Sequence, residues 1–186
     1  EDVYFGDVTI ERQGFWAVTM TYCDGVHVDG LTVRGNVSGY GPSTDGINTD
    51  SSRNVLVEHC DVAGNDDCLC LKAGRDADGL RVDRPTENVV YRHCTIGEGG
   101  GLVTIGSETS GGIRNVEAYD IQGKGTNTGV RFKSAKVRGG VVENVRLHDL
   151  DMDGVRTVFE WNLDWHPDYS YPTIPEDVPE SDYEPH

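Results

Sequence analysis

One short pattern recurs along the chain and limits its fold more than any other feature. A turn-forming residue is followed by valine at six places, and these valines lie 23, 29, 34, 27 and 29 residues apart in the 186-residue sequence. Intervals of about 20 to 45 residues are typical of proteins built from stacked repeats. We therefore predict a repeat protein whose repeats begin at Asp2-Val3, Gly25-Val26, Asn54-Val55, Asn88-Val89, Asn115-Val116 and Asn144-Val145.

The residues between these points favour strands over helices. Alternating β-branched residues follow each turn residue, and no segment has a helical apolar period of useful length. Strands one repeat apart would lie about 4.8 Å from each other, so equivalent inward positions would form rows. Because each repeat returns in the same direction, we predict an all-β, right-handed, single-stranded parallel β-helix of about six coils. One predicted core row, six residues after each turn residue, is Val8, Leu31, Cys60, Cys94, Ile121 and Leu150.

The cysteines fit this repeat better than they fit a disulfide framework or a metal site. The chain has five of them, an odd number, and their spacing does not match a zinc site. Cys60 and Cys94 belong to the core row, where a thiol behaves as a small buried hydrophobic group. We therefore expect neither a full disulfide framework nor a bound metal.

Two regions are predicted along the chain. Residues 1–160 are expected to form the coils of the β-helix. Residues 161–186 combine aromatic and acidic residues, and four of the seven prolines follow residue 170. Since proline cannot donate to a strand ladder, we expect this segment to pack on the coils or to trail from them.

The charge of the chain excludes one large class of partners. The 32 acidic and 16 basic residues give a net charge of −16, which opposes binding to nucleic acid phosphates. No apolar run reaches the roughly 18 residues of a membrane span, and the first residues lack the features of a signal peptide. We expect no nucleic acid partner and no membrane partner. With 20 aspartates and four lysines, the composition is typical of a halophile, although an ordinary acidic exported protein fits nearly as well.

Three aspartates interrupt the repeat and are the candidate catalytic residues. Asp45 and Asp66 are 21 residues apart, about one coil, so their carboxylates can project side by side. Asp67 can reach the same cleft only if the chain bends after Asp66, because adjacent strand residues face opposite sides. Crowding should raise the pKa of at least one carboxyl group, which supplies an acid beside ionised bases, as glycosidic cleavage requires. Taken singly, each aspartate also fits an ordinary turn residue.

A pair of cations is the second candidate feature. In Arg131-Phe132-Lys133 the alternation of a strand puts Phe132 into the core and both cations on the outer face. Such a pair suits the carboxylate of an anionic ligand. It suits an Asp or Glu of a neighbouring coil equally well, so the residues alone leave both possibilities open.

In order along the chain, these motifs resemble glycoside hydrolase family 28, the polygalacturonases and their relatives. The resemblance covers residues from about 3 to 172. It rests on Ser43-Thr44-Asp45-Gly46-Ile47, on Asp66-Asp67 followed by Cys68-Leu69-Cys70-Leu71-Lys72, on residues 101–112, and on Arg131-Phe132-Lys133.

The resemblance implies hydrolysis of α-glycosidic bonds in galacturonate-containing pectic chains, either polygalacturonate or rhamnogalacturonan. It implies that Asp66 is the general acid, that Asp45 and Asp67 activate water, and that Arg131 and Lys133 bind galacturonate. It also implies inversion at the anomeric carbon, for which acid and base carboxyl groups about 6.5 to 9.5 Å apart are typical. No metal and no cofactor are implied, and we expect a secreted monomer.

Two departures from the family pattern bear on activity. Ser43 stands where the family more often has asparagine, which we interpret as a tolerated variation. Gly100 stands where the family has a histidine that supports the catalytic carboxylates. Gly100 and Asp66 each lie 12 residues after a turn residue, at 88 and 54, so Gly100 is predicted to stack on Asp66. Hydrolysis could therefore be impaired.

Alternative interpretations follow from these departures. The chain is short for the family and has no polar cap at its first coil, so we expect an internal fragment. A β-helix that binds acidic polysaccharide without cleaving it is the main alternative function. A calcium-dependent pectate lyase is a third, and the cationic pair argues against it.

Overall fold

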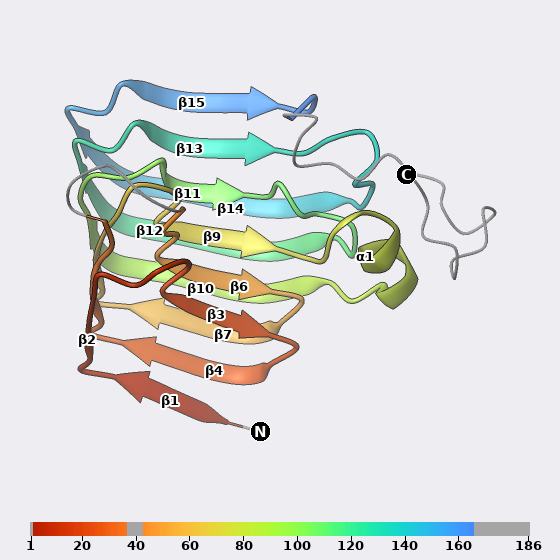
Figure 1. The fold of residues 1–186 in the computed structure, drawn as a ribbon, viewed down its shortest axis with the longest axis horizontal. Coiled ribbons are helices and arrows are strands. Elements are labelled where there is room, and N and C mark those ends of the chain that lie inside the picture. Colours follow the sequence, from red (N-terminus) through yellow and green to blue (C-terminus); the bar gives the residue numbers. More distant parts are fainter. Residues whose placement is uncertain (1, 37–42, 166–186) are drawn as a thin grey trace.

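The computed structural model describes residues 2–36 and 43–165, and within them the chain forms a right-handed parallel β-helix (Figure 1). Every strand pair in these residues is parallel. The first sheet contains β1 (Val3–Gly6), β2 (Thr9–Glu11), β4 (Asp24–Asp29), β5 (Thr32–Arg34), β7 (Arg53–Glu58), β8 (Asp61–Ala63), β10 (Thr86–Ile96), β12 (Ile113–Lys124) and β14 (Val142–Asp153). The second sheet contains β3 (Val18–Thr21), β6 (Ile47–Asp50), β9 (Leu69–Lys72), β11 (Gly101–Ile105), β13 (Thr128–Lys133) and β15 (Thr157–Asn162). The predicted fold class is confirmed, whereas the number of coils stays a prediction.

The turn residue of the repeat adopts the left-handed backbone conformation. Asn54, Asn88 and Asn115 have φ angles of 57°, 56° and 56°, a region that asparagine tolerates better than most residues. Their side chains form a ladder: Asn88 Nδ2 donates to Asn54 Oδ1 at 3.2 Å, and Asn115 Nδ2 donates to Asn88 Oδ1 at 3.1 Å. Asn144 Nδ2 continues it by donating to Asn115 Oδ1 at 2.7 Å. Backbone conformation and side-chain pairing together explain why asparagine recurs here.

Replacing Asn115 by Ala is expected to lower the free energy of unfolding by about 2 kcal/mol. Alanine loses both ladder hydrogen bonds and is strained at the left-handed φ of 56°. Asn115→Gly loses the same bonds but accepts this φ, so it should be the less damaging change. Urea unfolding of both variants checks this, and equal destabilisation would show that the backbone conformation contributes nothing.

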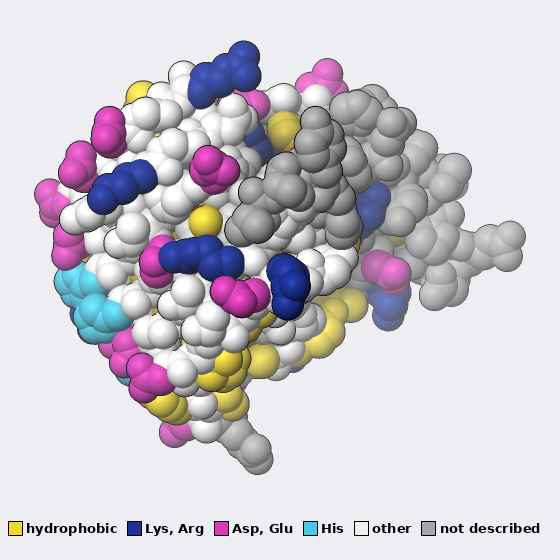
Figure 2. All heavy atoms as spheres, turned by 60° about the vertical axis from the view of Figure 1, so that its left-hand side comes forward, with side chains coloured by type: hydrophobic (Ala, Val, Ile, Leu, Met, Phe, Trp, Pro, Cys, Tyr) yellow, Lys and Arg dark blue, Asp and Glu magenta, His cyan; other side chains and the backbone are white. Residues whose placement is uncertain are grey.

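A second left-handed residue, which we did not predict, lies five positions after the turn residue. His59, His93 and Asp120 have φ angles of 54°, 54° and 50° and mark a corner of the first sheet. The rings of His59 and His93 stack with centroids 5.4 Å apart, and His93 Nδ1 lies 2.6 Å from Asp120 Oδ2. Figure 2 shows histidine side chains gathered at one edge of the visible face, with acidic side chains beside them. The bend turns the next residue of each repeat into the core.

The predicted core row is confirmed in the middle of the solenoid but not at its ends, where Val8 is exposed and Leu150 is half-buried. Leu31, Cys60, Cys94 and Ile121 are at most 2% exposed, and Cys94 is in register with Ile121. All five cysteines are free, and four of them are buried. Cys60, Cys68 and Cys94 belong to the apolar core and Cys23 packs against it, as predicted, whereas Cys70 lies near the charges of Lys72 and Asp67.

One helix interrupts the solenoid within the described residues. It is α1 (Asp76–Val82), which lies in the longest interval of the repeat and was not predicted. No helix of the described residues is long and apolar enough to cross a membrane. At the other end, β15 continues two residues beyond the predicted boundary at 160 and ends at Asn162. Most of the predicted C-terminal segment, residues 166–186, lies outside the described residues.

Candidate active site

The three candidate acids converge in one cleft of about 570 Å³. Asp45 comes just before β6, and Asp66 and Asp67 come just before the neighbouring strand β9. One carboxylate oxygen of each lies within 4.8 Å of the others. The chain bends at Asp66, so both members of the pair reach the cleft, as the sequence required. The three side chains are therefore placed together as expected.

Close backbone packing next to Asp45 fixes its position. Gly46 N–H donates to the Asp67 carbonyl at 2.9 Å, and Ile47 N–H donates to the Cys68 carbonyl at 2.8 Å. A Cβ atom at Gly46 would collide with the Cys68 carbonyl oxygen and with Val62. Glycine is therefore needed after Asp45 for the two chain segments to approach each other.

Asp67 is buried and bound to both candidate cations. Lys133 Nζ donates to Asp67 Oδ2 at 2.6 Å, and Arg131 Nη1 donates to Asp67 Oδ1 at 3.2 Å. Thr104 Oγ1 also donates to Asp67 Oδ1, at 2.8 Å. Burial opposes ionisation, but the charges of Lys133 and Arg131 hold the pKa of Asp67 below its ordinary value. Asp67 is thus an ionised carboxylate at neutral pH.

Arg131 and Lys133 form ion pairs with acidic residues of this chain. This is the second possibility that the sequence left open, the first being a ligand carboxylate. Arg131 Nε donates to Glu160 Oε2 at 2.8 Å in addition to its contact with Asp67. Arg131 and Lys133 are 9% and 8% exposed, so they face a cleft rather than open solvent. The Trp165 ring lies against both, 4.8 Å from Lys133 Nζ. A ligand carboxylate would have to share these cations with Asp67 and Glu160.

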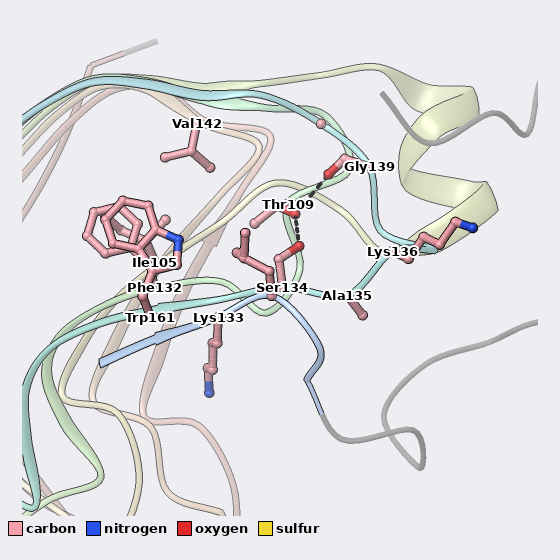
Figure 3. Close-up of a pocket in the computed structure, with 12 residues that line it drawn as sticks. Ile105, Thr109, Phe132, Lys133, Ser134, Ala135, Lys136, Gly139, Val142 and Trp161 are labelled. Atoms are coloured by element: carbon pink, nitrogen blue, oxygen red, sulfur yellow. Dashed lines mark hydrogen bonds between the residues drawn. The ribbon is translucent and has the colours of Figure 1, made fainter. Parts of the chain in front are cut away.

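The two sides of β13 serve different purposes. Phe132 lines a second, apolar cavity of about 430 Å³, where it stacks on Trp161 with ring centroids 4.3 Å apart. Figure 3 shows Lys133 pointing away from these two rings. The predicted alternation of Arg131-Phe132-Lys133 is confirmed, and β13 separates the apolar cavity from the acidic cleft.

The carboxyl group of Asp45 has a strongly raised pKa. It is 3% exposed, and burial raises its pKa to about 7. The nearby charge of Lys72 opposes this rise, whereas the charges of Asp67 and Asp66 add to it. One carboxyl group of the cluster therefore holds a proton near neutral pH, as expected, but burial is the main cause and the group is Asp45, not Asp66, to which the resemblance gives the role of acid.

A partly buried ion pair next to Asp45 was missed by the sequence analysis. Lys72 Nζ lies 3.6 Å from Asp45 Oδ2 and donates to Glu108 Oε2 at 2.9 Å. Burial of Glu108 opposes its ionisation, but the charge of Lys72 outweighs this effect and lowers the pKa of Glu108 to about 2. One signal was present in the sequence, because Lys72 is a charged residue at the end of the apolar run from Cys68 to Leu71. Lys72 and Glu108 therefore belong to the candidate site.

Asp66 is held by neutral groups. Ser43 Oγ donates to Asp66 Oδ2 at 2.6 Å, and the Asp67 N–H donates to Asp66 Oδ1 at 2.9 Å. Gly100 N–H donates to the Asp66 carbonyl at 2.8 Å, so Gly100 stacks on Asp66 as its position in the repeat predicted. Ser43 thus gives direct support to the candidate acid from the position where asparagine was expected.

Two groups of described residues have a geometry that could hold a metal ion. One is the set of three aspartates, and the other is His27, Asp29 and Glu58 on the first sheet. In the first, Lys133 already lies 2.6 Å from Asp67. In the second, Arg92 lies 2.7 Å from Glu58 and His27 lies 2.8 Å from it. In both sets, a carboxylate that could bind a metal ion is therefore already in contact with a basic side chain of the chain.

Known proteins resemble this chain over most of its length. The family model described as glycosyl hydrolases family 28 matches residues 1–162. A probable polygalacturonase of Vitis vinifera is 33% identical over 174 residues, which cover 91% of this chain and 35% of that protein. An endo-polygalacturonase of Pectobacterium parmentieri is 36% identical over 113 residues, covering 61% of this chain and 26% of that protein.

Solved structures agree with these sequence matches. A hyperthermoactive exopolygalacturonase from Thermotoga maritima superposes with a TM-score of 0.82 at 31% identity, covering 86% of this chain and 36% of that one. A polygalacturonase from Erwinia carotovora gives a TM-score of 0.77 at 28% identity, over 89% of this chain and 41% of that one. The chain thus spans about a third of the length of these relatives. Since the family model covers almost all of the described coils, the chain belongs to glycosyl hydrolase family 28.

Proposed function

We propose that this chain carries the catalytic centre of a polygalacturonase-type enzyme that hydrolyses α-glycosidic bonds in galacturonate-containing pectic chains. The observation that carries the proposal is the convergence of three carboxylates within 4.8 Å in one cleft. The relatives support it, because several of them are named as polygalacturonases. Since pectic polymers lie outside cells, we also propose that the enzyme acts there.

In the proposed mechanism, Asp66 protonates the leaving oxygen with a proton that it shares with Asp45 in the carboxyl cluster, and Asp67 and Asp45 activate water. Asp67 is the permanently ionised member, because Lys133 and Arg131 lower its pKa. Oxygens up to 4.8 Å apart can both bond to one water, since two bonds of about 2.8 Å then meet at about 118°. Ser43 orients Asp66 through its 2.6 Å hydrogen bond. Proton donation and water activation of this kind each contribute about 10² to 10⁴ in rate.

The stereochemical outcome is a separate part of the proposal. We expected acid and base carboxyl groups about 6.5 to 9.5 Å apart, whereas the closest oxygens here lie within 4.8 Å. The 4.8 Å limit is a distance between one oxygen of each residue, whereas the expected range refers to the distance between whole carboxyl groups. We propose inversion on the family resemblance. Proton NMR of the first product measures it: a new β-anomer supports inversion, and a new α-anomer would contradict it.

The release of sugar ends separates the proposed hydrolase from its alternatives. Incubated with polygalacturonate and a chelator, the chain should form reducing ends without an ultraviolet-absorbing unsaturated product. An unsaturated product that needs calcium would identify a lyase. Binding without any release of ends would favour the non-catalytic alternative, which the glycine at position 100, in place of the family histidine, keeps open.

Replacing Gly100 by His is expected to raise the rate of hydrolysis, by up to about 10² if the imidazole supports the carboxylates as a positioned group. A Cβ atom at Gly100 would lie 3.2 Å from Asp66 Oδ1 and 3.1 Å from the Asp66 carbonyl carbon, so small adjustments accommodate it. Gly100→Ala is the matched control, because it adds the same Cβ without the ring. A rate that is equal in the two variants would contradict the proposed role of this position.

A further inference from the structure

A stacked aromatic pair stands at one side of the acidic cleft. The rings of Phe15 and Trp16 lie nearly parallel, with centroids 4.9 Å apart and an angle of 16° between their planes. Both residues line the cleft that contains the three aspartates. Phe15 is 55% exposed, so this large apolar ring contributes little to the core. A ligand in the cleft would meet it.

Hydrogen bonds connect this pair to the segment that carries Asp45. Ala17 N–H, directly after Trp16, donates to the Asp45 carbonyl at 2.9 Å. The Lys72 ammonium lies 4.6 Å from the centre of the Trp16 ring and 3.6 Å from Asp45 Oδ2. The aromatic pair is therefore held beside a candidate catalytic carboxylate before any ligand binds, which reduces the entropy lost on binding.

The chemistry of the two rings selects one part of a sugar. The face of an aromatic ring is negative and its edge is positive. Such a face attracts the weakly positive C–H groups on the apolar side of a pyranose ring, and it repels a carboxylate. At the other side of the cleft, Arg131 and Lys133 supply positive charge beside Asp67. A chain of uronic acid units offers both an apolar ring face and a carboxylate in every unit.

We propose that Phe15 and Trp16 form a stacking subsite for a pyranose ring of the substrate chain, next to Asp45. The inference rests on the proposed function and adds a binding site for a sugar unit beyond the two that flank the reacting bond. The subsite contacts a ring whose shape and charge change little during cleavage elsewhere in the chain. Its contribution should therefore appear mainly in KM, because such binding is similar in the ground state and the transition state.

Kinetics on oligogalacturonides of increasing length test the subsite. Phe15→Ala is expected to raise KM about 3- to 10-fold on the longer oligomers, and to raise KM more than it lowers kcat. Phe15→Trp keeps a flat ring and should restore most of the affinity. Tyr22→Ala is the matched control: Tyr22 is 50% exposed and contacts Arg84, with its ring 5.1 Å from the guanidinium carbon. It is not among the residues that line the cleft, so its loss should leave KM unchanged.

Two failures are distinguishable in this experiment. An active wild-type chain with an unchanged KM in Phe15→Ala, or with equal changes in Phe15→Ala and Tyr22→Ala, would overturn the subsite and leave the proposed function intact. A wild-type chain that neither hydrolyses oligogalacturonides nor binds them, measured by tryptophan fluorescence, would overturn the proposed function and the subsite with it.

Discussion

Asp67→Asn is expected to lower the free energy of unfolding by about 3 to 5 kcal/mol and to remove hydrolysis of polygalacturonate. Asp67 is 1% exposed and accepts hydrogen bonds from Lys133, Arg131 and Thr104. An amide cannot neutralise Lys133, so the variant keeps a buried ammonium without the carboxylate that compensates it. It also loses the ionised group proposed to activate water. Urea unfolding followed by circular dichroism measures the first effect, and release of reducing ends measures the second.

The matched control for this variant is Asp61→Asn. Asp61 also pairs with an arginine, Arg34, but its side chain is 48% exposed. Exposed pairs contribute about 0 to 1 kcal/mol, so this variant should unfold close to the wild type and keep its activity. Equal destabilisation of the two variants would contradict the view that burial makes the Asp67 pairs important.

Lys72→Met is expected to change the pH dependence of hydrolysis. The pKa of Asp45 is about 7 with Lys72 present, and the lysine charge lowers it. A base must be ionised, and kcat/KM reports the pKa of the free enzyme, so wild-type kcat/KM should rise as the pH rises through about 7. Methionine removes the charge, which raises the pKa of Asp45 further and moves this rise to higher pH by about one unit or more. The variant also leaves Glu108 without its 2.9 Å partner, so a loss of stability should accompany the shift.

Profiles of kcat/KM against pH for the wild type, Lys72→Met and Lys124→Met check this prediction. Lys124 is exposed at the end of β12, so its loss should leave the profile in place. An unchanged midpoint in Lys72→Met would show that Asp45 does not titrate under the influence of Lys72. A wild-type kcat/KM that does not rise as the pH rises through about 7 would show that Asp45 is not the base.

The repeat was predictable because it is local and periodic. A left-handed asparagine before each valine and a buried row six residues later are properties of short segments, and stacking multiplies a weak signal. The second bend at His59, His93 and Asp120 was missed because it uses different residue types in different coils. Helix α1 was missed because it occupies a single interval and has no counterpart in the other repeats.

The sequence predicted where the acidic residues of the site lie, but it did not predict which basic residues they pair with. A separation of 21 residues sufficed to bring Asp45 beside Asp66, because it equals about one coil. The contacts of Asp67 with Arg131 and Lys133 cross 64 and 66 residues and depend on side chains that reach past β11. The Lys72–Glu108 pair crosses 36 residues in the same way. No local pattern encodes which of several buried charges will meet.

Hydrolysis of polygalacturonate by Asp66→Asn, measured beside the wild type as release of reducing ends, tests the central claim most directly. Asp66 accepts a hydrogen bond from Ser43, and no Lys or Arg of the described residues forms an ion pair with it, so the substitution should leave the fold intact. If Asp66 protonates the leaving oxygen, the folded variant should lose activity by about 10² to 10⁴. A folded variant that hydrolyses the polymer at the wild-type rate would contradict the assignment of the three aspartates as the catalytic centre.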